Sequence, residues 1–144
     1  MDSYSTPRWL LSNTFKSFTS SNVHLLSLAP RKPIAKVFLI CPADSPYAGG
    51  LFMCTLEVSY TRKVTLHFET PILHPNVTSE GHYEGSLSVS RGDFCLKQVL
   101  LDILQMLREP DWTRVTSPVL AEMYSASPEA CLQEVARFTK VWAY

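Results

Sequence analysis

The chain has 144 residues, and its 46% share of hydrophobic residues is typical of a globular protein rather than a disordered one. This length suits one domain with one core, so we expect a single domain over residues 1–144. Lys plus Arg and Asp plus Glu both number 13, which leaves no net charge to attract nucleic acid or an anionic membrane. Such a neutral surface is compatible with a protein that lives in a complex.

The ends and the cysteines of the chain indicate an intracellular protein. Residues 1–5 lack a basic segment followed by an apolar one, and no apolar run approaches the ~18 residues of a membrane span. The cysteines form no C-x-x-C pair and predict no disulfide framework; they are Cys41, Cys54, Cys95 and Cys131. We therefore expect the protein in the cytoplasm, the nucleus or both.

The first half of the chain predicts a helix followed by four strands. Thr6 and Pro7 suit the start of a helix, and a short apolar face follows over residues 11–18. Four apolar runs, with turns and no helices between them, then indicate an antiparallel meander. The expected strands are Val23–Leu28, Ile34–Cys41, Leu51–Val58 and Val64–Phe68.

The second half predicts three helices, which completes an α+β fold. Asp93 suits the N-cap of the strongest helix, which Pro110 ends, and Ser117-Pro118 and Ser127-Pro128 start the other two. Each of two helices carries an apolar stripe at helical spacing that we expect in the core. The first stripe is Leu96, Val99, Leu100, Ile103 and Leu107, and the second is Cys131, Val135, Phe138 and Trp142.

Three motifs in this order resemble the ubiquitin-conjugating enzyme family. Residues 45–50 read Ser-Pro-Tyr-Ala-Gly-Gly before an apolar strand, His74-Pro75-Asn76 follows, and residues 85–89 read Gly-Ser-Leu-Ser-Val. The family has S-P-Y-x-G-G, H-P-N and G-S-(I/L)-C-L, and the cysteine of the last motif carries ubiquitin as a thioester. The expected order of elements is also that of the family, so the resemblance covers nearly the whole chain and implies the ubiquitin-conjugating-enzyme fold.

The resemblance also implies that the nucleophile of the family is absent. Matching residues 85–89 puts Ser88 at the cysteine position, whereas counting from His74 without a gap puts Glu84 there. In the family the asparagine of H-P-N is the oxyanion donor; Asn76 either keeps that role or holds the backbone of its loop. Cys95 is the nearest downstream thiol, and its place at a helix start supports the alternative of a displaced catalytic cysteine.

Two loops that contact ligases in the family differ in this chain. Residues 58–63 replace a longer proline-rich loop, and residues 90–94 shorten the W-S-P-A turn. A tryptophan stands in the connection between the first two C-terminal helices, where the family has a polar loop. Trp112 either caps the core or, with Arg114, forms a partner-binding site, because both residue types are enriched at binding hot spots.

Other chemistry finds no support in the sequence. The four histidines, His24, His67, His74 and His82, show no metal-ligand spacing with the cysteines, and no phosphate-binding loop occurs. We expect no cofactor and no metal. The leading hypothesis is a non-catalytic conjugating-enzyme variant that binds ubiquitin, an active conjugating enzyme or a larger complex. The alternatives are an active enzyme that uses Cys95 and an adaptor in a complex unrelated to ubiquitin.

Overall fold

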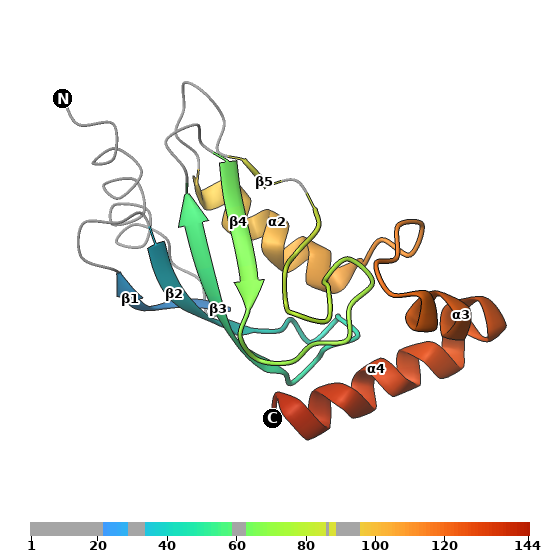
Figure 1. The fold of residues 1–144 in the computed structure, drawn as a ribbon. Coiled ribbons are helices and arrows are strands. Elements are labelled where there is room, and N and C mark those ends of the chain that lie inside the picture. Colours follow the sequence, from blue (N-terminus) through green and yellow to red (C-terminus); the bar gives the residue numbers. More distant parts are fainter. Residues whose placement is uncertain (1–21, 29–33, 59–62, 86, 89–95) are drawn as a thin grey trace.

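A five-stranded antiparallel sheet forms the centre of the computed structural model, which describes residues 22–28, 34–58, 63–85, 87–88 and 96–144 (Figure 1). The strands lie side by side in chain order: β1 (Val23–Leu28), β2 (Ile34–Ile40), β3 (Leu51–Val58), β4 (Lys63–Phe68) and β5 (Leu87–Ser88). The predicted meander of four strands is confirmed. The two-residue β5 is an addition, too short to leave an alternating pattern in the sequence. The helix expected before β1 lies outside the described residues.

Alternation of side chains gives the sheet one buried and one exposed face. In β3, Phe52, Cys54 and Leu56 are buried, whereas Leu51 and Met53, which alternate with them, are exposed. The same alternation continues in β4, because successive side chains of a strand point to opposite faces. The sheet therefore needs a partner layer on one face only.

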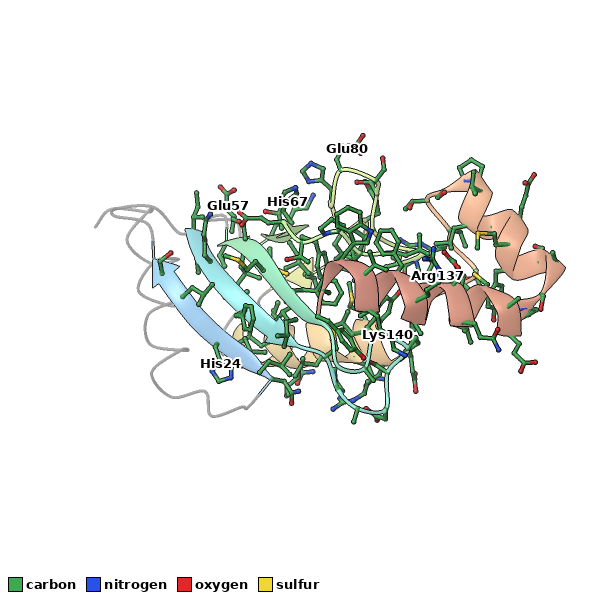
Figure 2. The ribbon with its side chains drawn as sticks, turned by 90° about the horizontal axis from the view of Figure 1, so that it is seen from below. His24, Glu57, His67, Glu80, Arg137 and Lys140 are labelled. Atoms are coloured by element: carbon green, nitrogen blue, oxygen red, sulfur yellow. The ribbon has the colours of Figure 1, made fainter. Side chains whose placement is uncertain are left out.

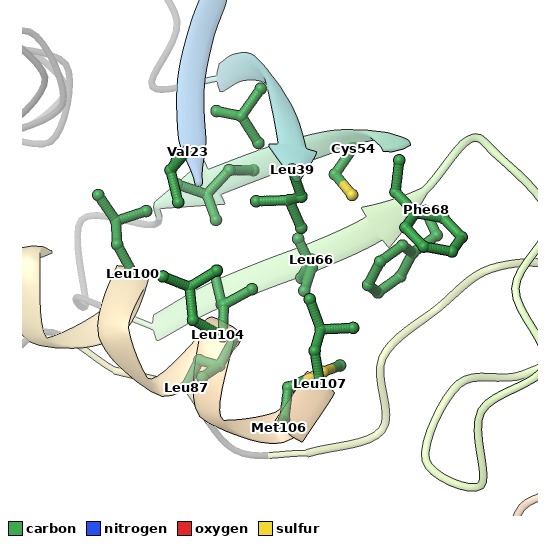
Figure 3. Close-up of a cluster of buried hydrophobic side chains, with 14 of the residues drawn as sticks. Val23, Leu39, Cys54, Leu66, Phe68, Leu87, Leu100, Leu104, Met106 and Leu107 are labelled. Atoms are coloured by element: carbon green, nitrogen blue, oxygen red, sulfur yellow. The ribbon is translucent and has the colours of Figure 1, made fainter. Parts of the chain in front are cut away.

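Helix α2 (Leu96–Arg108) supplies that layer. Figure 3 shows Leu100, Leu104 and Leu107 of this helix meeting Leu39 and Leu66 of the sheet. These side chains are at most 3% exposed, as expected for an apolar stripe at spacings of three and four residues. The predicted stripe is confirmed from Val99 onward. The side chain of Leu96 is not among those described.

Helices α3 (Pro118–Ala126) and α4 (Pro128–Trp142) form a pair beyond one end of the sheet (Figure 1). Each begins with a serine N-cap followed by proline, as predicted. The hydroxyl of Ser117 accepts a hydrogen bond from the Leu120 N–H at 3.3 Å, and that of Ser127 accepts one from the Ala130 N–H at 3.2 Å. These caps satisfy helix N–H groups that have no partner within the helix.

The buried face of α4 differs from the predicted one at its end. Cys131 and Val135 are buried as expected, but Trp142 is 55% exposed, so its assignment to the core is wrong. The buried positions continue instead with Thr139 and Ala143. Small side chains are needed there because the helix end lies against the Gly-Gly turn before β3. A Cβ atom on Gly50 would lie 2.7 Å from the methyl group of Thr139.

Candidate functional site

His74 anchors the H-P-N segment in the core. Its ring is 1% exposed and stacks on Tyr47, with centroids 5.5 Å apart and planes 17° from parallel. Nε2 donates to the carbonyl of Met106 at 2.9 Å, because a carbonyl can only accept, and Nδ1 accepts from the Asn76 N–H at 3.0 Å. Burial lowers the pKa of His74 to about 4. The neutral ring thus joins the first two motifs and α2.

Asn76 holds a loop that lies 35 residues further along the chain. Its side-chain N–H groups donate to the carbonyls of Asp111 at 3.0 Å and Arg114 at 2.7 Å, and its Oδ1 accepts from the Asp111 N–H at 3.0 Å. The residue is 6% exposed. An amide group has two N–H donors, and both are used here. The side chain of Asn76 therefore binds backbone groups, which was one of the two roles expected from the sequence. The groups it binds belong to the α2–α3 loop and not to its own loop.

Further contacts fasten the α2–α3 loop along the same segment. The N–H of Thr116 donates to the carbonyl of Pro75 at 2.7 Å, and its hydroxyl donates to the carbonyl of Val77 at 3.1 Å. The guanidinium group of Arg114 donates to the carbonyl of Glu84 at 3.1 Å. An open depression of about 470 Å³ results between the two segments. It is lined by Thr78, Glu84, Arg114, Val115 and Thr116.

The structure separates the two candidate positions for the nucleophile. The N–H of Glu84 donates to the carbonyl of Asn76 at 2.8 Å, so Glu84 lies directly beside the H-P-N segment. Ser88 lies in β5 opposite Lys63, at the end of β4 away from Phe68. Four residues of extended chain span ~13 Å. Counting from His74 without a gap therefore identifies the residue beside Asn76, which is Glu84 and not Ser88.

Gly81 allows the tight turn between the H-P-N segment and Glu84. It adopts φ +96°, and a Cβ atom there would lie 2.2 Å from the carbonyl oxygen of Phe68. Only glycine fits such a position. The N–H of Gly81 donates to the carbonyl of Thr78 at 2.9 Å and closes a turn, and the carbonyl of Gly81 accepts from the Phe68 N–H at 2.7 Å. Gly81 thus shapes the turn that returns the chain to Glu84 beside Asn76.

The described cysteines lie in the core. Cys41, Cys54 and Cys131 are each at most 4% exposed. Burial raises the pKa of Cys41 to about 12 and raises those of the other two thiols. A buried, protonated thiol is inert because the thiolate is the nucleophile. Cys95, the displaced nucleophile of the alternative hypothesis, lies outside the described residues.

Trp112 is half-buried and packs against the core. Its ring stacks on Tyr124 of α3, with centroids 4.2 Å apart and planes 4° from parallel. Arg114 is exposed and points toward Glu84, where it lines the depression. The proposed partner pair is thus divided: Trp112 joins the loop to α3, and Arg114 faces the depression beside Asn76.

Within the residues that the structure describes, no helix is both long and apolar enough to cross a membrane. In the same residues, no group of three or more His, Cys, Asp or Glu side chains could hold a metal ion.

The fold and the H-P-N geometry define the chain as a domain of the ubiquitin-conjugating type. The sequence model described as "Ubiquitin-conjugating enzyme" matches residues 19–139, so the chain belongs to the ubiquitin-conjugating enzyme family. One relative, named ubiquitin-conjugating enzyme E2 14, from Schizosaccharomyces pombe, is 38% identical over 89 residues. This match spans 58% of the present chain and 57% of the relative.

Proposed function

We propose that the chain is a non-catalytic member of its family that binds proteins as a scaffold or regulatory subunit in the ubiquitin pathway. One observation carries the proposal: Glu84, and not a cysteine, lies beside Asn76. Carrying ubiquitin as a thioester requires a thiol at that place. A carboxylate cannot form this bond, and the described thiols are buried elsewhere with raised pKa values.

The surroundings of Glu84 support the same proposal. An oxyanion donor must have a free N–H aimed at the reacting carbonyl group. Both side-chain N–H groups of Asn76 already donate to backbone carbonyls, at 3.0 Å and 2.7 Å. The guanidinium group of Arg114 donates to the carbonyl of Glu84 at 3.1 Å and so ties the α2–α3 loop to the backbone of this residue. These contacts stabilise the loop, and they support a structural rather than a catalytic role for Asn76.

Two other functions are distinguishable by experiment. An active enzyme that uses Cys95 would form a thioester lost in Cys95→Ser. An adaptor unrelated to ubiquitin would form no thioester and would bind neither ubiquitin nor a conjugating enzyme, because fold does not determine function.

The test of the proposal is binding to ubiquitin-pathway proteins. We would titrate the ¹⁵N-labelled chain with ubiquitin and then with active conjugating enzymes from its own source, and follow amide shifts by NMR. Saturable shifts confined to one surface support the proposal. No shift with either class, together with affinity purification of a complex that lacks ubiquitin-pathway proteins, favours the unrelated adaptor.

A further inference from the structure

Two histidines that are far apart in the sequence meet at the edge of the sheet next to the H-P-N segment. His67 lies in β4, and His82 lies opposite it in an antiparallel bridge. Their ring centroids are 4.7 Å apart, and the ring planes are inclined by 50°. His67 is half-buried and His82 is exposed, so solvent ions reach both rings. No role in the proposed function uses this pair.

A backbone contact prepares His67 to act as a metal ligand. Its Nε2 lies 2.9 Å from the carbonyl oxygen of Glu80. A carbonyl oxygen only accepts, so Nε2 carries the proton and Nδ1 keeps its lone pair. Metal-binding histidines commonly donate their second ring N–H to a carbonyl in this way, which orients the ring. Figure 2 shows His67 and Glu80 at the same edge of the molecule.

The spacing of the two rings suits one shared ion. Rings whose centroids lie 4.7 Å apart can share an ion that is bound about 2.0–2.1 Å from one nitrogen of each ring. The exposed His82 ring can turn toward the ion without leaving a packed environment.

We propose that His67 and His82 form a two-histidine chelate for a divalent transition-metal ion, with water completing the coordination shell. The ion would join β4 to the turn that ends at Glu84. Imidazole is the commonest metal ligand in proteins and suits Ni²⁺, Cu²⁺ and Zn²⁺. The sequence did not predict this pair, because 14 residues separate the two histidines and the turn at Gly81 is needed to bring them together.

The test is isothermal titration of the full chain with Ni²⁺ in a non-coordinating buffer at neutral pH. Wild type and His24→Ala should bind one ion per chain with equal affinity, because the control histidine lies on β1 at the other side of the sheet. His82→Ala and His67→Gln should each bind at least tenfold more weakly. Glutamine keeps a side-chain donor for the Glu80 carbonyl but removes the imidazole. Circular dichroism verifies that each variant is folded.

A second readout identifies the ligands directly. In histidine side-chain NMR spectra of the wild type, Zn²⁺ should shift the ring signals of His67 and His82 and leave that of His24 unchanged. Acidification should weaken binding, because protons compete for the imidazole nitrogens. Undiminished affinity in both variants, an equal loss in His24→Ala, or no saturation by about 1 mM Ni²⁺ overturns the proposal.

Discussion

Asn76 shows how one residue can keep a family motif and serve the structure. Its amide group makes three hydrogen bonds to the backbone of the α2–α3 loop, and its own backbone contacts Glu84. The H-P-N letters alone did not distinguish this function from oxyanion binding. The distinction depends on the position of residues 111–114 next to Asn76 in the fold. A short sequence motif does not reveal such a long-range contact.

Replacing Asn76 with Ala should destabilise the protein. The change removes the partner of the Asp111 N–H and of the Arg114 carbonyl in a part-buried place, and an unpaired group of this kind costs about 1–3 kcal/mol. We expect the free energy of unfolding to fall by about 2–4 kcal/mol in urea titration. Thr113→Ala, an exposed change in the same loop, is the control and should cost less. Equal stability of Asn76→Ala and wild type would contradict this function.

His74 should make the protein sensitive to acid. Its pKa is about 4 in the folded state against an ordinary value of 6.5, so the unfolded chain binds the proton more readily. The contribution of the neutral ring to the free energy of unfolding is fully present above pH 6.5 and is lost progressively as the pH falls toward 4. The free energy of unfolding falls in total by on the order of 3 kcal/mol.

Urea unfolding at a series of pH values measures this effect. In His74→Gln the dependence of stability on pH should flatten between pH 6.5 and 4, although the variant is less stable at neutral pH. An unchanged pH dependence in His74→Gln would show that other groups control the acid sensitivity.

At the scale of elements, the sequence predicted the strands and helices well because their apolar periodicity is strong. The boundaries differ by one residue: β2 ends at Ile40 rather than Cys41, and β4 begins at Lys63 rather than Val64. The error at Trp142 has another cause. Periodicity predicts an apolar stripe on α4, but the close contact between the end of α4 and Gly50 determines which face of the helix is buried. Only small side chains fit at that contact.

The exposure of Trp142 predicts a small effect of its removal. Trp142→Ala should change the free energy of unfolding by less than about 1 kcal/mol, because the ring is 55% exposed. Val135→Ala, on the buried face of the same helix, should cost about 2 kcal/mol. Thermal unfolding compares the two variants. A larger loss for Trp142→Ala than for Val135→Ala would restore the tryptophan to the core.

The stack of Trp112 on Tyr124 should couple the α2–α3 loop to α3. Stacked aromatic pairs contribute about 0.5–1.5 kcal/mol beyond the area they bury. A double-mutant cycle with Trp112→Ala and Tyr124→Ala should therefore give a coupling energy in that range. Additive effects of the two changes would show that the rings act independently; the prediction that Trp112 contributes to partner binding is separate from this measurement.

At the scale of the whole molecule, the chain has the architecture of its family, and the proposed loss of catalysis concerns the residues beside Asn76. The fold followed from periodicity and from the resemblance, because most of the buried surface lies in regular elements. The site did not, because its geometry depends on the turn at Gly81 and on the return of the α2–α3 loop. The Gly85–Val89 match favoured Ser88, whereas the backbone places Glu84 beside Asn76.

The intact mass of the chain after a charging reaction tests the absence of catalysis most directly. The chain is incubated with activating enzyme, ATP and ubiquitin, with an active conjugating enzyme as a positive control, and is analysed by mass spectrometry without reductant. This measurement detects a thioester, an oxyester or an amide at any residue. We predict an unchanged mass. A mass increased by one ubiquitin would contradict the account, and its loss in Cys95→Ser would identify an active enzyme with a displaced cysteine.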